Sequence, residues 1–115
     1  MSWTHYEDLI VWQKAMNLVD ETYSLVQFLP DSEKYALSDQ MRRSAISIPS
    51  NIAEGHGRRT DNEFKQFLSV ARGSVCELET QIFIAIRQNY LSKESATTAL
   101  SLCVEIRKIL TKLMF

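Results

Sequence analysis

The sequence predicts an all-α fold, an antiparallel up-down four-helix bundle in a single domain that spans residues 1–115. Three Gly and two Pro in 115 residues are too few for the many turns of a β architecture. Four segments repeat apolar residues at alternating intervals of three and four, which is the spacing of one helix face. Because the connections between these segments are short, neighbouring helices should run antiparallel.

The first helix is predicted to run from about Leu9 to Val26, before Pro30 ends the pattern. We expect its buried seam to consist of Leu9, Trp12, Met16, Val19, Tyr23 and Val26.

The second helix should bury Leu37, Met41, Ala45, Ile48 and Ile52. Pro49 lies inside this pattern, where it removes a backbone donor and crowds the carbonyl of Ala45, so a kink or a local break is expected. The helix should end at residues 55–57, Gly-His-Gly, where the glycines can adopt the left-handed conformation.

The third helix should begin at Thr60, which forms a capping box with Glu63. Its predicted seam consists of Phe64, Leu68, Ala71, Val75, Leu78, Ile82 and Ala85. The fourth helix should begin near Ser92, with a seam of Ala96, Ala99, Cys103, Ile106, Leu110 and Leu113. Cys76 and Cys103 fall inside these apolar patterns, so both are expected to be buried free thiols.

The apolar residues of the last two helices outnumber their seams. A second apolar stripe on a helix indicates either a wider core or a subunit interface, so we expect the protein to form a homo-oligomer. The additional residues are Phe67, Phe83, Ile84, Ile86, Leu102 and Ile109.

Several function classes are disfavoured by the sequence. The only histidines, His5 and His56, form no Glu-x-x-His pair of a di-iron bundle, and no phosphate-binding glycine loop is present. We therefore expect no enzyme, no cofactor and no metal site; a metal protein would need an ion at Glu54, Glu77 or Glu79. No signal peptide and no membrane-spanning apolar run is found, so a soluble, cytoplasmic protein without a membrane partner is expected.

Charge is distributed unevenly although the net charge is only −1. Residues 1–41 hold two basic and seven acidic side chains, whereas residues 42–72 hold six basic and three acidic ones. An anionic partner should therefore meet the middle of the chain. The candidate phosphate-binding residues are Arg42, Arg43, Arg58, Arg59, Lys65 and Arg72.

Polar residues form a second stripe on each of the two middle helices. Those of the second helix are Gln40, Arg43, Ser47, Asn51, Glu54 and Arg58, and those of the third are Ser74, Glu77 and Gln81. They could satisfy one another between the two helices and fix their register. They could also form a polar binding surface or a subunit interface.

Three segments of the chain resemble the family of bacterial 23S rRNA intervening-sequence proteins, also called the S23 family. The opening YEDLIVWQKA at residues 6–15 resembles the start of these proteins, and QMRRSAISIPSNIAEG at residues 40–55 resembles their central signature. The third helix adds Phe67-Leu68, Ala71-Arg72-Gly73-Ser74 and Glu77-Leu78-Glu79-Thr80. The resemblance extends to about Leu91, and the last helix matches only in pattern.

The resemblance implies an antiparallel four-helix bundle assembled as a homopentameric ring, of unestablished molecular function. A related branch, the accessory variability proteins of diversity-generating retroelements, binds nucleic acid through a basic pentameric barrel, and the slightly acidic sequence departs from that branch. Two functions are therefore weighed. One is a non-enzymatic RNA-binding or scaffold protein, and the other is a protein-interaction module without nucleic-acid contact.

Overall fold

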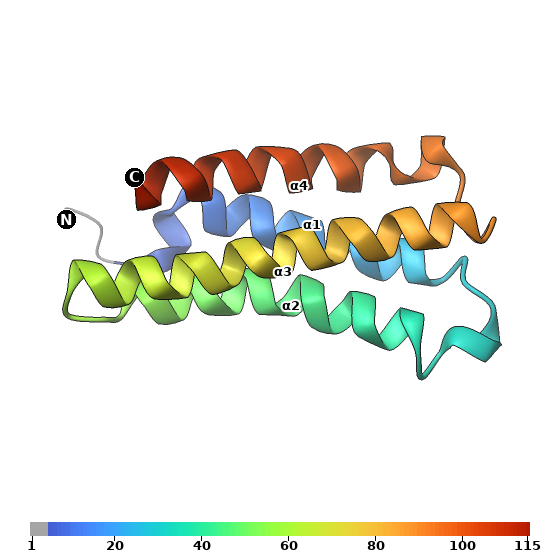
Figure 1. Ribbon diagram of the computed structural model, residues 1–115, viewed down its shortest axis with the longest axis horizontal. Helices are drawn as coiled ribbons and strands as arrows, with labels where there is room; N and C mark the ends of the chain where they lie inside the picture. The colour runs from blue at the N-terminus through green and yellow to red at the C-terminus, as the bar shows by residue number, and fades with distance from the viewer. Residues whose placement is uncertain (1–4) are drawn as a thin grey trace.

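The computed structural model describes residues 5–115. All regular secondary-structure elements in that range are helices, joined by short loops. Four α-helices follow one another: α1 (Ile10–Val26), α2 (Leu37–His56), α3 (Asp61–Arg87) and α4 (Lys93–Met114). Two short 3-10 helices, η1 (Tyr6–Asp8) and η2 (Asp31–Glu33), precede α1 and α2. Figure 1 shows the four long helices running side by side in an up-down arrangement, which confirms the predicted four-helix fold.

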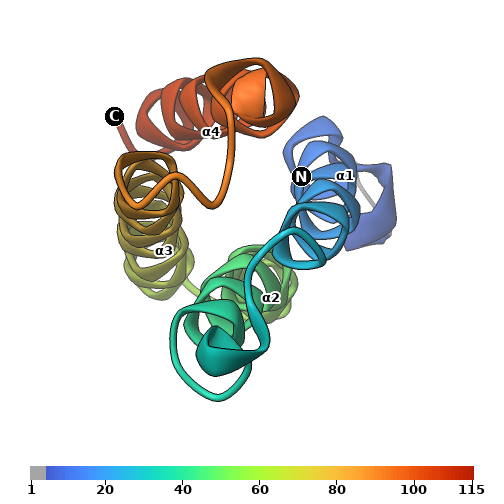
Figure 2. The same cartoon turned by 90° about the vertical axis from the view of Figure 1, so that its right-hand side faces the viewer.

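The helices surround one core in chain order, as the end view in Figure 2 shows. Each helix packs on its neighbours in the chain, and α1 closes the ring of helices by packing on α4. The seams predicted for α2, α3 and α4 are confirmed, because their members are buried in this core or packed against its edge. Most of them have no exposed surface at all, among them Met41, Ala45, Ile48, Ile52, Leu68, Val75, Ile82 and Ile106.

The seam predicted for α1 is confirmed at Leu9 and Val26, which are buried in the core, and wrong at Met16 and Tyr23, which are exposed. Trp12 and Val19 are only half-buried, while Met16 and Tyr23 are 39% and 43% exposed. The buried face lies one residue earlier and contains Val11, Ala15, Leu18, Thr22 and Leu25. Two apolar stripes run along this helix, and the sequence pattern favoured the one with the larger side chains. The true seam includes a threonine, whose hydroxyl donates to the carbonyl of Leu18 at 2.7 Å and so can be buried at low cost.

Helix ends follow the sequence in part. Thr60 caps α3 by accepting from the backbone N–H of Glu63, and Ser92 caps α4 in the same way from Ser95. Helix α2 ends at His56 as expected, but no glycine in the described range has a positive φ. The left-handed residue is instead Asn89, in the turn between α3 and α4, with φ 63°. The prediction of left-handed glycines after α2 is therefore wrong.

Pro49 neither splits nor ends α2, which is one continuous helix from Leu37 to His56. Of the two cysteines, Cys103 is buried in the core as predicted, whereas Cys76 is exposed on α3, so the expectation for Cys76 is wrong. Within the part of the chain that the structure describes, no helix combines the length and apolarity needed to cross a bilayer.

Candidate functional site

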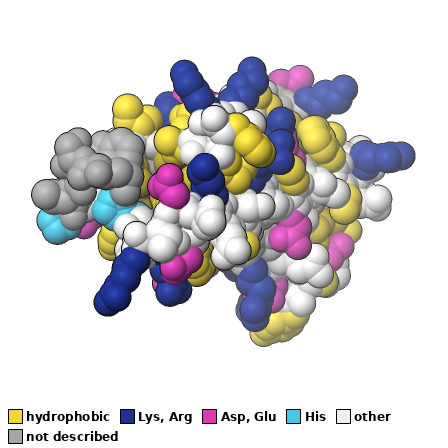
Figure 3. All heavy atoms as spheres, turned by 60° about the vertical axis from the view of Figure 1, so that its left-hand side comes forward, with side chains coloured by type: hydrophobic (Ala, Val, Ile, Leu, Met, Phe, Trp, Pro, Cys, Tyr) yellow, Lys and Arg dark blue, Asp and Glu magenta, His cyan; other side chains and the backbone are white. Residues whose placement is uncertain are grey.

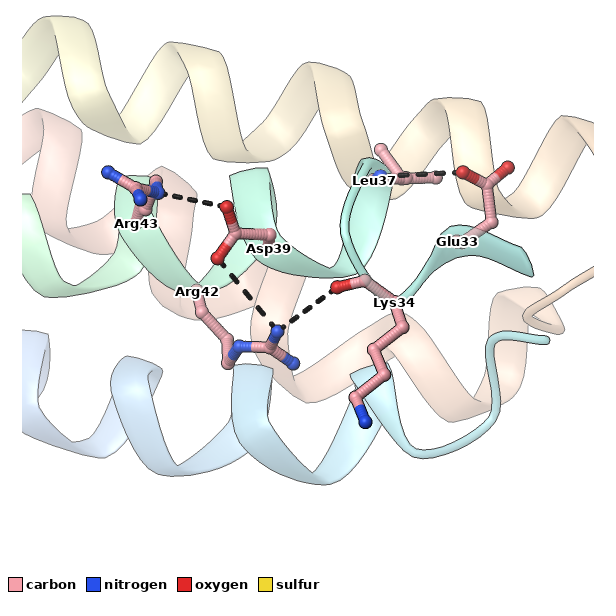
Figure 4. Close-up of polar contacts among 6 residues, drawn as sticks. All are labelled: Glu33, Lys34, Leu37, Asp39, Arg42 and Arg43. Atoms are coloured by element: carbon pink, nitrogen blue, oxygen red, sulfur yellow. Dashed lines mark hydrogen bonds and ion pairs between the residues drawn. The ribbon is translucent and has the colours of Figure 1, made fainter. Parts of the chain in front are cut away.

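The first arginine doublet lies one turn into α2 and shares a single acidic partner (Figure 4). Arg43 donates from Nε to Oδ2 of Asp39 at 3.0 Å, and Nη2 of Arg42 lies 4.0 Å from Oδ1 of the same carboxylate. Arg42 also donates to the backbone carbonyl of Lys34 at 3.4 Å. The Arg43 side chain is still 78% exposed. Two guanidinium groups therefore share one aspartate, and Glu77 of α3 lines the same small depression as Arg43.

The second doublet follows the end of α2. Arg58 donates to Glu54 at 3.1 Å, and its guanidinium lies 4.7 Å from the centre of the Phe67 ring. Arg59 is exposed and has no hydrogen bond or ion pair with any other residue in the range 5–115. The start of α3 beside it already holds the cap of Thr60 and two acidic side chains, Asp61 and Glu63. The cap and the two carboxylates partly neutralise the positive end of the α3 dipole, so the first turn of α3 is a weak site for a further anion.

The structure does not bring the six basic residues together. The two doublets lie at opposite ends of α2, separated by about 20 Å at a rise of 1.5 Å per residue. Lys65 and Arg72 are exposed and lie seven residues apart, on one face of α3. Arg72 precedes Ser74 by two residues, so it points away from the side of α3 that meets α2. Figure 3 accordingly shows Lys and Arg side chains dispersed among apolar and acidic ones.

The two polar stripes do meet, at the junction of α2 and α3. Ser47 and Ser74 share a hydrogen bond of 2.8 Å, and Asn51 donates to both the hydroxyl and the carbonyl of Ser47. One turn further, Ser44 donates to Glu77 at 3.4 Å. These bonds cross-link the helices between their apolar seams and fix their register. Ser44 was missed by the sequence pattern, in which it stands between the two stripes of α2.

A small depression, here called the polar groove, opens beside these bonds. It has a volume of about 210 Å³ and is lined by Gln40, Arg43, Ser44, Ser47, Glu77 and Gln81. Gln81 is only 7% exposed, and its Oε1 is buried without a hydrogen-bond partner among residues 5–115. Glu54 and Arg58, at the other end of the α2 stripe, pair with each other outside this groove.

The three glutamates that a metal site would require lie apart. Glu54 pairs with Arg58, Glu77 accepts from Ser44, and Glu79 pairs with Arg107 of α4 at 3.4 Å. No three potential metal ligands converge anywhere in residues 5–115.

A second depression, here called the apolar groove, lies between α1 and α2. It has a volume of about 300 Å³ and is lined by Tyr6, Trp12, Met16, Val19, Ile46, Pro49, Ser50 and Ala53. The sequence pattern missed it because three of these residues had been assigned to the core. The sequence feature that could have predicted the groove is the seven-residue interval between Ile46 and Ala53, which places both side chains on one side of α2.

An apolar surface also lies on the far side of the bundle, between α3 and α4. Of the additional apolar residues, Phe83 and Ile84 are 50% and 43% exposed. The others, Phe67, Ile86, Leu102 and Ile109, are half-buried. A depression of about 630 Å³ there is lined by Phe83, Ile86, Arg87, Lys93, Thr97, Leu100 and Ser101.

The fold and these surfaces define a small four-helix-bundle protein that carries exposed arginines on and just after α2 and a polar junction between α2 and α3. The chain belongs to the family of 23S rRNA-intervening sequence proteins, whose model matches residues 7–112. This match confirms the resemblance seen in the sequence.

A solved structure supports the same assignment. The chain is similar to a protein of unknown function from the S23 ribosomal protein family of Bacteroides thetaiotaomicron, with a TM-score of 0.84 and 26% identity. The similarity covers 91% of this chain and 98% of that one. Among curated proteins, none matches the sequence.

Proposed function

We propose that this protein is a non-enzymatic homo-oligomer that binds RNA through phosphate contacts of its exposed arginines. The observation that carries the proposal is the Arg42–Arg43 doublet, where two guanidinium groups share one carboxylate and Arg43 remains 78% exposed. Only its Nε is committed to Asp39, so the outer edge of the guanidinium is free to bind a phosphate in bidentate fashion. The family description, which refers to sequences within 23S rRNA, makes RNA the anionic partner to test first.

Assembly of several copies would strengthen the weak attraction of one copy's arginines for RNA. One chain has a net charge of −1 and separated basic groups, which is a poor basis for binding RNA alone. The apolar groove between α1 and α2 and the apolar surface between α3 and α4 lie on opposite sides of the bundle. A contact between two such different surfaces is heterologous, and it closes into a ring when the rotation permits. A ring, with five copies as the family resemblance implies, would repeat each doublet around one axis.

The proposal is tested by fluorescence anisotropy with 23S rRNA fragments and unrelated RNA across a salt series, with light scattering to measure the assembly. Binding should weaken as salt rises, since displaced counterions drive it. Replacing Arg42, Arg43, Arg58 and Arg59 with Ala should abolish most binding and flatten the salt slope. A control replaces two exposed cations that lie away from both doublets and line neither apolar surface, Lys108 and Lys112, with Ala. Absence of binding at low salt by a well-assembled protein would contradict the proposal.

The second function, a protein-interaction module, is favoured by the apolar groove. In this case the groove would receive a side chain or helix of another protein, and the interaction would depend little on salt. Two variants separate the two functions. If the protein is an interaction module, the arginine variant should retain its protein partner, whereas a variant of the apolar groove should lose it.

A further inference from the structure

The polar groove between α2 and α3 contains a buried amide oxygen, Oε1 of Gln81, that no residue in the described range 5–115 satisfies. Gln81 as a whole is 7% exposed. An unsatisfied buried polar group is costly in free energy, so native proteins rarely retain one without a use. A half-turn of the amide about its last torsion exchanges its two ends, so Gln81 can present either an acceptor or a donor to the groove.

Glu77 supplies the second element of the site. Its carboxylate is exposed at the groove, and its one hydrogen bond comes from Ser44 at a long 3.4 Å. A carboxylate is best satisfied by two parallel N–H donors from one planar group. Arg43 stands at the same groove with its guanidinium largely exposed. The groove thus combines a carboxylate with a single long hydrogen bond, an amide oxygen without a partner among residues 5–115, and a cation.

These groups select a particular kind of ligand. Two adjacent N–H donors beside a carbonyl acceptor occur on the Watson–Crick edge of guanine, whose N1–H and N2–H would face the carboxylate while O6 faces the amide. Adenine, cytosine and uracil do not place two donor groups side by side on this edge. An arginine side chain also has two parallel donors, but the guanidinium of Arg43 in the same groove would repel it. A volume of about 210 Å³ is below the ~300–1,000 Å³ of drug-sized pockets and suits a single planar base.

We propose that the polar groove binds one unpaired guanine of a single-stranded RNA, with Glu77 and Gln81 reading its Watson–Crick edge. This inference rests on the proposed RNA-binding function, because Arg43, which would contact the adjoining phosphate, lines the same groove. Phosphate contacts would then position the strand, and the groove would supply the base preference that arginines alone cannot give.

Titration of the ¹⁵N-labelled protein with guanosine monophosphate tests the groove directly. The side-chain amide resonances of Gln81 should shift with this nucleotide and not with adenosine monophosphate or free arginine. Both nucleotides carry the same phosphate, so the difference isolates the base. Absence of a shift at Gln81, equal shifts with both nucleotides, or a shift with arginine alone would overturn the inference.

A second experiment measures base preference on RNA. An all-uridine strand is compared with the same strand carrying one central guanosine, and the latter should bind at least about fivefold more tightly. Glu77→Gln should remove this preference, and its effect on the binding of the all-uridine strand should be no larger than that of removing the same charge at a glutamate outside the groove. Glu94→Gln, at an exposed glutamate in the first turn of α4, is the matched control.

The two proposals fail in different ways. Equal affinity for both strands, or a preference that survives in Glu77→Gln, would overturn the guanine site while leaving phosphate binding intact. Failure of the all-uridine strand to bind would count against phosphate binding by the arginines. In that case the nucleotide titration still decides on the groove.

Discussion

Gly55 of α2 lies directly against Phe67 of α3: a Cβ at Gly55 would lie 2.8 Å from the Cβ of Phe67. The same Cβ would lie 3.3 Å from the backbone oxygen of Phe64. Neither neighbour is the flexible end of a side chain, so the helices would have to separate to accept it. The glycine that appeared in the sequence to end the helix is therefore required for packing, since its φ is not positive.

Gly55→Ala should lower the free energy of unfolding by about 1–3 kcal/mol, the usual cost of overpacking, although Ala favours the helical state. Urea unfolding followed by circular dichroism measures it. Gly73→Ala is the control, because a Cβ there meets nothing within 4 Å. That variant should gain about 0.5–1 kcal/mol from helix propensity. Equal effects at the two positions would contradict the close approach of α2 and α3.

The hydrogen bond between Ser47 and Ser74 should couple the two helices energetically. Ser74→Ala removes the partner of a half-buried hydroxyl and should cost about 1 kcal/mol. In a double-mutant cycle with Ser47→Ala, the two effects should add to more than the effect of the double variant, because one bond is counted twice. Additive effects would show that the two hydroxyls do not interact in solution.

The apolar groove between α1 and α2 should be needed for assembly. Met16→Glu places a charge in the groove at a side chain that is already 39% exposed, so the fold should persist while the oligomer dissociates. Light scattering measures the molar mass. Asn17→Glu, on the neighbouring exposed position of α1, adds the same charge outside the groove and should leave the assembly unchanged. Dissociation in both variants, or in neither, would count against the groove as an interface.

Cys103 should make stability fall at high pH. Burial, with a further contribution from Glu79, raises the pKa of the Cys103 thiol from 9.0 to about 12. The folded state thus keeps a proton that the unfolded state releases, so this stabilisation is complete below pH 9 and is lost as the pH rises towards 12. The free energy of unfolding of the wild type should fall across this pH window more steeply than that of Cys103→Ala, which lacks the thiol.

Thiol labelling offers an independent check on the two cysteines. At mildly alkaline pH, a maleimide should modify the exposed Cys76 quickly and the buried Cys103 only after unfolding. Rapid modification of both thiols in the folded protein would contradict the burial of Cys103 and the pH dependence argued from it.

The fold could be predicted from the sequence because the seams of α2, α3 and α4 each have one dominant apolar face. Helix α1 could not be placed in the same way. Its two apolar stripes differ by one residue, and periodicity does not state which stripe meets the core. The small Ala15 and the polar Thr22 lie inside, while the larger Met16 and Tyr23 remain outside. That choice depends on how closely α4 approaches, which is a tertiary property.

The candidate site was predictable only in its parts. The polar stripes of α2 and α3 were visible as repeats, and antiparallel packing brings Ser47 to Ser74. The separation of the two arginine doublets could also be predicted, because the helical rise of about 1.5 Å per residue places Arg43 and Arg58 at opposite ends of one helix. The sequence could not reveal that Gln81 would be buried without a partner, since this depends on which side chains line the groove.

The packing of each helix on its neighbours in the chain also bears on how quickly the protein reaches its folded state. Most contacts join segments that are close in sequence. The packing of α1 on α4 joins the two ends of the chain, and it includes the ion pair of Lys14 with Glu105. Helical bundles with such local contacts fold in microseconds to milliseconds. The closure of α1 on α4 is therefore expected to be the step with the largest entropic cost.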